Sequence, residues 1–252
     1  PAVQSFWIDD TPSIKERTMR LLMLASGLML LGLLGPAAAA QELPLFDAHV
    51  HYNQHDWSAY SPEAILGLLD RADVRWALTS STPDEGTVRL YEKSPARVVP
   101  VLRPYRTPAD QGGWTTDTSL IPYVEERLKR GIYKGIGEFH LSGAQAGDPV
   151  VQAFARIGET RGRFLYAHTD AAGIEALVRR YPRVRWLWAH AGLGEAFPAV
   201  ARAMERNPGL VADLSLKSEI SSGGTINPRW RDLFLKLPDR FLVGSDTYVT
   251  AQ

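Results

Sequence analysis

Short apolar segments alternate with longer amphipathic segments along most of this chain. The apolar segments are rich in Val, Ile, Leu, Phe and Trp, which is typical of strands that are buried on both faces. Eight strands are predicted on this basis, at residues 45–51, 75–80, 97–103, 133–139, 163–168, 185–190, 210–214 and 240–246.

The segments between the strands carry apolar residues at helical spacing. Ser61 and Pro62 are typical of a helix start, and Ile65, Leu68 and Leu69 continue as an apolar stripe. Further helices are predicted at residues 119–130, 149–161, 171–181 and 195–206. Strands that alternate with helices form a parallel sheet, and eight such repeats predict a (β/α)8 TIM barrel of the α/β class. A doubly wound open sheet is the alternative, but it should carry a glycine-rich turn after its first strand, where this chain has histidines.

The sequence predicts a targeting segment at the N-terminal end and an incomplete barrel at the C-terminal end. Met19-Arg20, an apolar run at residues 21–34 and the alanines at 37–40 are typical of a signal peptide. A membrane anchor is the alternative, although about 14 apolar residues are short for a bilayer. Residues 1–40 are therefore expected to be an upstream segment and signal peptide. Residues 41–252 are expected to form an exported barrel, periplasmic or secreted, without a stable membrane anchor. Only six residues follow the last predicted strand, so the barrel is expected to lack its eighth helix at the C-terminus.

Composition narrows the functional classes. The chain has 28 Lys and Arg against 28 Asp and Glu, so no excess of positive charge favours nucleic acid or an anionic membrane as a partner. Cysteine is absent, which excludes disulfides, thiolate metal sites and a cysteine nucleophile. Nothing in the sequence indicates an oligomeric state.

Polar residues recur where the predicted strands end, which is where barrels of this kind build their active sites. Four of the six histidines lie at such ends. The residues at strand ends are His49, His51, Glu138, His168, His190 and Asp246. His49 and His51 point to one face because residues two apart in a strand do so. Imidazoles and carboxylates are costly to bury alone, and one divalent cation satisfies both. The expected cofactor is one or two such cations, zinc first, with manganese, iron or nickel also compatible.

These motifs together resemble a known family. They are Asp47-Ala48-His49-Val50-His51, Gly137-Glu138, His168, Ala189-His190-Ala191-Gly192 and Gly244-Ser245-Asp246. Over residues 43–248 the chain resembles the amidohydrolase superfamily, in the branch called amidohydrolase 2. The resemblance implies a metal-dependent barrel enzyme in which His49, His51, His168 and Asp246 are metal ligands. Relatives carry a carbamylated lysine, a glutamate or neither on the fourth strand, so Glu138 is compatible with a second metal and equally with hydrogen bonding alone.

The resemblance also implies a mechanism. A bound metal would lower the pKa of water and make hydroxide available. Asp246 would accept the proton of the water and later deliver it to the leaving group, and His190 would stabilise charge that develops on the carbonyl. Asp47 is expected to orient a histidine ligand. These expectations make Asp246 and His190 the catalytic residues.

Substrate binding is assigned to three residues near strand ends, Arg103, His140 and Lys217. Arg103 and Lys217 could hold a substrate carboxylate, or they could be surface cations, and His140 shares a face with Glu138. The expected function is hydrolysis of a C–N or C–O bond in a small-molecule amide, lactone or ester. The alternatives are a decarboxylase or other lyase of the same superfamily, a TatD-like nuclease, which the balanced charge disfavours, and a metal-binding barrel without catalysis.

Overall fold

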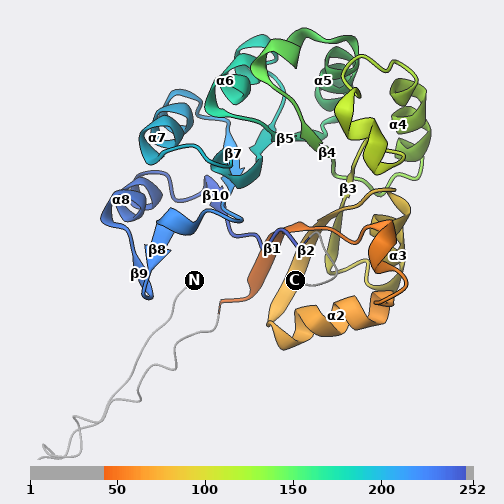
Figure 1. The fold of residues 1–252 in the computed structure, drawn as a ribbon, viewed down its shortest axis with the longest axis horizontal. Helices are drawn as coiled ribbons and strands as arrows, with labels where there is room; N and C mark the ends of the chain where they lie inside the picture. The colour runs from red at the N-terminus through yellow and green to blue at the C-terminus, as the bar shows by residue number, and fades with distance from the viewer. Residues whose placement is uncertain (1–42, 248–252) are drawn as a thin grey trace, which may run out of the picture. The chain divides into compact units, whose positions relative to one another are not determined.

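The computed structural model describes residues 43–247. Its main sheet has eight parallel strands in the order of the chain, which lie inside a ring of helices (Figure 1). The strands are β1 (Leu45–Val50), β2 (Val74–Ser80), β3 (Val98–Leu102), β4 (Gly135–His140), β5 (Phe164–His168), β6 (Trp186–Trp188), β7 (Val211–Asp213) and β10 (Phe241–Leu242). Each overlaps a segment predicted from the sequence, and the prediction of a TIM barrel is confirmed.

The last strand returns to the first and closes most of the ring. β10 itself pairs with β7, and the segment that follows it runs along β1. The backbone nitrogen of Ala48 donates to the oxygen of Val243 at 2.9 Å, and that of His51 donates to Thr247 at 2.9 Å. The carboxylate of Asp47 receives the backbone N–H of Ser245 at 2.9 Å and its hydroxyl at 2.6 Å. The two ends of the sheet are therefore joined beside the residues of interest.

Within residues 43–247, seven α-helices follow the first seven strands of the barrel. They are α2 (Pro62–Arg71), α3 (Glu85–Lys93), α4 (Leu120–Leu128), α5 (Pro149–Arg161), α6 (Ala171–Arg180), α7 (Phe197–Arg206) and α8 (Pro228–Lys236). Ser61 caps α2 through the N–H of Ala64, as the sequence predicts. The helices α3 and α8 were not predicted, and neither was the hairpin of β8 (Ser221–Ser222) and β9 (Thr225–Ile226).

Short 3₁₀ helices fill several of the loops. They are η1 (Gln54–Asp56), η2 (Pro108–Gly112), η3 (Gly143–Gly147), η4 (Ala189–Ala191) and η5 (Ser218–Ile220). The helix η4 directly follows β6 and contains His190.

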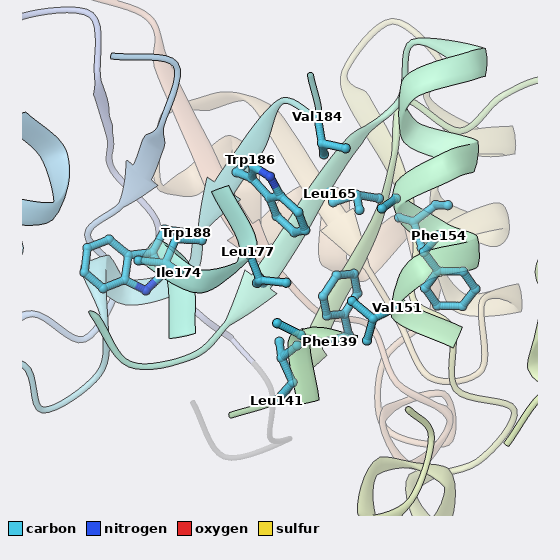
Figure 2. Close-up of a cluster of buried hydrophobic side chains, with 14 of the residues drawn as sticks. Phe139, Leu141, Val151, Phe154, Leu165, Ile174, Leu177, Val184, Trp186 and Trp188 are labelled. Carbon is cyan, nitrogen blue, oxygen red and sulfur yellow. The ribbon is translucent and has the colours of Figure 1, made fainter. Parts of the chain in front are cut away.

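The apolar core has two layers, because alternate residues of each strand point to opposite faces. Leu165 and Trp186 lie in the outer layer and belong to the same cluster as Val151 and Phe154 of α5 (Figure 2). Tyr166 and Leu187, one residue further along the same two strands, belong to a second cluster built almost entirely from strand residues. This inner cluster fills the barrel, so the polar groups that follow it at the strand ends rest on a packed floor.

Two expectations from the sequence concern residues that the structure does not describe. The signal peptide at residues 1–40 and any helix after Thr247 lie outside the described residues. Among residues 43–247, no helix has the length and apolar character needed to cross a bilayer.

Candidate metal centre

Residues 243–247, which follow β10 and run along β1, are called the closing segment. Two imidazoles and two carboxylates meet where β1, β4 and this closing segment come together. The Nε2 atoms of His49 and His51 are 3.1 Å apart. An oxygen of Glu138 lies 3.5 Å from each of these nitrogens. An oxygen of Asp246 lies 3.4 Å from His49 Nε2 and 3.3 Å from His51 Nε2. All four side chains are buried, so residues from the two ends of the chain share one enclosed point.

The histidines of the fifth and sixth strands border the same point. His190 Nε2 lies 3.5 Å from Glu138 Oε1 and 3.9 Å from Asp246 Oδ2. His168 Nδ1 lies 2.7 Å from Glu138 Oε1. The structure therefore brings together all six residues that the sequence places at strand ends, with Glu138 in contact with every histidine of the set.

Local backbone geometry puts these side chains in position. Gly137 has a φ of +136°, and a Cβ atom there would lie 2.2 Å from the carbonyl oxygen of Tyr166, so only glycine fits beside β5. His190 and Asp246 adopt the left-handed conformation, with φ of 57° and 55°. Such values are uncommon for residues with a side chain and concentrate at functional sites.

The histidine rings are oriented by hydrogen bonds on their outer nitrogens. His51 Nδ1 contacts the carbonyl oxygen of Ser80, and His190 Nδ1 lies 3.1 Å from the carbonyl oxygen of Ser215. A carbonyl oxygen only accepts hydrogen bonds, so each Nδ1 carries the proton. The Nε2 lone pairs of these two rings then face the shared point, which is the arrangement of metal-binding histidines.

Three residues behind this cluster are not predicted from the sequence as part of the site: Tyr166, Asp213 and Ser215. Tyr166 Oη lies 2.6 Å from His49 Nδ1 and donates to Asp213 at 2.7 Å. Ser215 Oγ lies 2.9 Å from His190 Nδ1 and contacts Asp213. One signal was available, because Asp213 is a carboxylate next to the last residue of the seventh predicted strand, at residues 210–214.

The crowding of charges shifts several pKa values in the metal-free protein. Burial lowers the pKa of His49, but the carboxylates of Glu138 and Asp213 outweigh burial and raise it to about 10. Burial raises the pKa of Glu138, but His49 and the hydrogen bonds from His168 and His190 hold that pKa well below its usual value. The pKa of Asp246 is also lowered, since contacts with His51 and His49 outweigh its burial. Both carboxylates are thus ionised at neutral pH.

This donor set fits a divalent cation. Three overlapping groups have ligand atoms within 4.8 Å of one another: His49, His190 and Asp246; His49, His51 and Glu138; and Glu138, His140 and His168. Imidazole nitrogens and carboxylate oxygens are the ligands of zinc and its neighbours in the first transition row. The two facing Nε2 atoms of His49 and His51 need a proton or a cation between them, because two lone pairs otherwise repel each other.

The family follows from comparison of sequences. The family model for amidohydrolases matches residues 126–252, half of the chain. The chain belongs to the amidohydrolase family. It is an enzyme, a hydrolase of the metal-dependent kind that the donor set fits. A comparison with curated protein sequences gave no significant match.

Solved structures resemble this amidohydrolase in fold. A probable 2-pyrone-4,6-dicarboxylic acid hydrolase from Acinetobacter baumannii, with citric acid bound, is 13% identical with a TM-score of 0.55, over 83% of this chain and 86% of that one. A putative 2-pyrone-4,6-dicarboxylic acid hydrolase from Pseudomonas putida is 16% identical with a TM-score of 0.52, over 81% and 83%. A TatD homologue from Escherichia coli K12 is 15% identical with a TM-score of 0.55, over 81% and 79%. At these identities the likeness concerns the barrel alone.

A cavity of about 450 Å³ opens above the candidate metal centre of the amidohydrolase. Arg103 lines it, with Nε donating to the carbonyl oxygen of Glu138 at 3.2 Å and Nη2 donating to its carboxylate at 3.1 Å. The third nitrogen, Nη1, lies 3.4 Å from His51 Nδ1, which already donates to Ser80. The N–H groups of Arg103 Nη1 therefore remain available to a ligand. His140 also lines the cavity, and burial lowers its pKa to about 3, so the ring is neutral.

Two residues do not lie where the sequence analysis expected them. Lys217 does not line the cavity: its buried ammonium donates to the carbonyl oxygens of Gly192 at 3.0 Å and Glu195 at 2.6 Å. Its expected role as a substrate clamp therefore has no support from the geometry, and it ties the loop after β7 to the loop after β6. Asp47 does not contact a histidine ring, although the sequence predicts that it orients one. It accepts hydrogen bonds from the backbone N–H of His49, at 3.1 Å, and from Ser245. The ring of His49 is oriented instead by Tyr166, Ser215 and Asp213.

Proposed function

We propose that this amidohydrolase cleaves a C–N or C–O bond of a small carboxylate-bearing molecule, an amide, ester or lactone, at the centre formed by His49, His51, Glu138, His168 and Asp246. The observation that carries the proposal is the convergence of the Glu138 and Asp246 carboxylates, each within 3.5 Å of both His49 Nε2 and His51 Nε2, on the floor of a cavity of about 450 Å³. His168 joins this group through Glu138 Oε1, at 2.7 Å. A cavity of this size suits a small metabolite.

A divalent cation held by these residues would supply Lewis acidity, polarising a carbonyl and lowering the pKa of water. The chain supplies the proton transfers. Asp246 is ionised and borders the cavity, so its carboxylate can take a proton from the attacking water and return it to the leaving group. His190 Nε2 faces the same space and can donate or accept at the carbonyl oxygen of the substrate.

Arg103 supports the choice of a carboxylate-bearing substrate. Its guanidinium lies at the cavity wall with Nη1 unengaged by any acceptor, while Glu138 fixes the other two nitrogens. A fixed guanidinium edge is well suited to a carboxylate oxygen. The dicarboxylate named for the Acinetobacter and Pseudomonas structures is consistent with this class of substrate.

The test uses the full chain, stripped with a chelator and reloaded separately with Zn²⁺, Mn²⁺, Ni²⁺ or Fe²⁺. Lactones and esters that carry a carboxylate are followed with a pH indicator, because their hydrolysis releases a proton. Amides are followed by the appearance of the amine. Decarboxylation consumes a proton and releases CO2, so it is distinguished in the same assay. Asp246→Asn is expected to lower kcat by about 10²- to 10⁴-fold.

The matched control is Asp232→Asn, which changes an exposed carboxylate on α8 and is expected to leave kcat unchanged. Proton uptake with release of CO2 would replace hydrolysis by a lyase reaction. An Asp246→Asn protein with full activity would remove Asp246 from the reaction.

A further inference from the structure

Asp213 is buried at the end of β7 and accepts four short hydrogen bonds, with His49 Nδ1 as a longer fifth contact at 3.4 Å from Oδ1. The backbone N–H of Ser215 donates to Oδ1 at 2.9 Å, and that of His190 donates to Oδ2 at 3.0 Å. The hydroxyl of Ser215 donates to Oδ1, and that of Tyr166 donates to Oδ2 at 2.7 Å. Both oxygens therefore act as acceptors, and the carboxylate has no need of a proton of its own.

The hydroxyls of Tyr166 and Ser215 each have one proton, and each donates it in a hydrogen bond to Asp213. Tyr166 Oη also lies 2.6 Å from His49 Nδ1, and Ser215 Oγ lies 2.9 Å from His190 Nδ1. In these second contacts the oxygens can only accept, so the proton must come from the ring nitrogen in both cases.

We propose that Asp213 is a positioning residue that acts through the hydroxyls of Tyr166 and Ser215. It holds His49 and His190 in the tautomer with a proton on Nδ1, so that each Nε2 lone pair points at the cation site. One carboxylate thus fixes the rings of two histidines that come from distant segments, His49 on β1 and His190 in η4. The inference rests on the metal centre of the proposed function and is independent of which bond the enzyme cleaves.

The two histidines depend on Asp213 to different degrees. His190 Nδ1 has a second acceptor, the carbonyl oxygen of Ser215 at 3.1 Å, which fixes the same tautomer independently. His49 Nδ1 contacts the Tyr166 hydroxyl at 2.6 Å, the Ser215 hydroxyl at 3.1 Å and Asp213 Oδ1 at 3.4 Å. Each of these acceptors is Asp213 or a hydroxyl that Asp213 orients, and none is a backbone carbonyl. His51 is held by the carbonyl oxygen of Ser80 and has no contact with Asp213. His49 is therefore the most sensitive ring, and His51 serves as an internal reference.

The test is Asp213→Asn, an isosteric change that puts an amide N–H where a carboxylate oxygen accepts. The amide N–H would donate to the Tyr166 oxygen, and the Tyr166 proton would turn toward His49 Nδ1. In Zn²⁺-loaded protein labelled with ¹⁵N-histidine, long-range ¹H–¹⁵N NMR spectra are expected to lose the Nδ1–H signature of His49 and to retain that of His51. Only six histidines contribute to the spectrum. Zn²⁺ affinity, measured by chelator competition, is expected to fall by about 10- to 100-fold.

The matched control is Asp84→Asn. Asp84 is also fully buried and also accepts a tyrosine hydroxyl, that of Tyr133, but its bonds go to Tyr133, Tyr123 and Arg127 and include no histidine. This variant is expected to lower the melting temperature and to leave Zn²⁺ affinity and the histidine spectra unchanged. An equal loss of Zn²⁺ affinity in Asp84→Asn would attribute the effect to general destabilisation and overturn the proposal.

A second variant decides the matter if Asp213→Asn does not fold. Tyr166→Phe removes the shortest contact of His49 Nδ1 and no contact of His190, so the His49 signals are expected to shift and Zn²⁺ affinity to fall by about tenfold, while the His190 signals stay. Unchanged His49 signals and affinity in a folded Asp213→Asn or Tyr166→Phe protein would overturn the proposal. None of these readouts uses a substrate, so a failure to find hydrolysis leaves them intact.

Discussion

The affinity of the metal centre for a cation is expected to rise steeply with pH. In the metal-free protein, burial lowers the pKa of His49, but Glu138 and Asp213 raise it above the ordinary value of 6.5 to about 10. A raised pKa means that His49 keeps its proton throughout the neutral range. A cation must displace that proton to reach Nε2, so binding is opposed more strongly as the pH falls below 10.

The size of the effect follows from the number of protons released. One displaced proton changes the apparent Kd tenfold per pH unit, so the Kd is expected to fall about 100-fold between pH 7 and pH 9, or about 2.7 kcal/mol. The pKa of His190 is also raised, because its hydrogen bond to Glu138 and the charge of Asp213 outweigh its burial. A second proton from His190 would make the dependence steeper.

The assay is competition for Zn²⁺ with a chromophoric chelator at constant ionic strength, corrected for protonation of the chelator. Glu138→Gln is the informative variant. It removes a ligand carboxylate of the proposed centre, so its affinity should be lower overall. It also removes the strongest of the influences that raise the pKa of His49, so its affinity should depend less on pH. A Kd of the unaltered protein that stays constant from pH 7 to pH 9 would refute the reasoning.

Three further predictions concern single features. Arg103→Ala is expected to raise KM for a carboxylate-bearing substrate about tenfold or more, whereas Lys217→Met should leave KM unchanged and lower the melting temperature, since Lys217 donates to two loop carbonyls. The reverse pattern in steady-state kinetics would restore Lys217 as the clamp. Gly137→Ala is expected to destabilise the protein by about 2 kcal/mol or more in chemical denaturation, because its Cβ would collide with the Tyr166 carbonyl, while Gly112→Ala meets open space and should change stability by less than about 0.5 kcal/mol. Zn²⁺ at 100 times its Kd is expected to stabilise the metal-free protein by about 2.7 kcal/mol, and calorimetry that shows no rise in melting temperature would contradict a folded-state site.

The barrel could be predicted from the sequence because its strands are short, apolar and regularly spaced. The convergence of the residues in the candidate metal centre could be predicted for a related reason, since a polar side chain stands out at the end of an apolar strand. The strand boundaries were less accurate at the site itself. The strand predicted to run to His190 ends at Trp188, and the one predicted to run to Asp246 ends at Leu242. Both polar residues adopt positive φ values that an extended strand does not allow.

What the sequence could not provide were contacts between distant segments. Asp213 gives no local sign of its partners, because Tyr166 and the histidines that it serves lie on other strands. Lys217 reads as a potential substrate ligand until the carbonyl oxygens of the neighbouring loop are placed around it. The helix α3 has a glycine in its first turn and few apolar residues, so its stripe is weak without the barrel behind it.

The closing segment carries a ligand on the same short stretch that seals the barrel. Asp47 of the first strand and Ser245 beside Asp246 are 198 positions apart and are held together by only a few bonds. An ion bound by both His49 and Asp246 would cross-link β1 to the closing segment, so these two segments could separate only if the ion were released. Amide protons at Ala48, His51 and Asp246 should then exchange with solvent deuterium more slowly when the cation is bound. Their exchange rates would therefore report how much of the protein carries the cation.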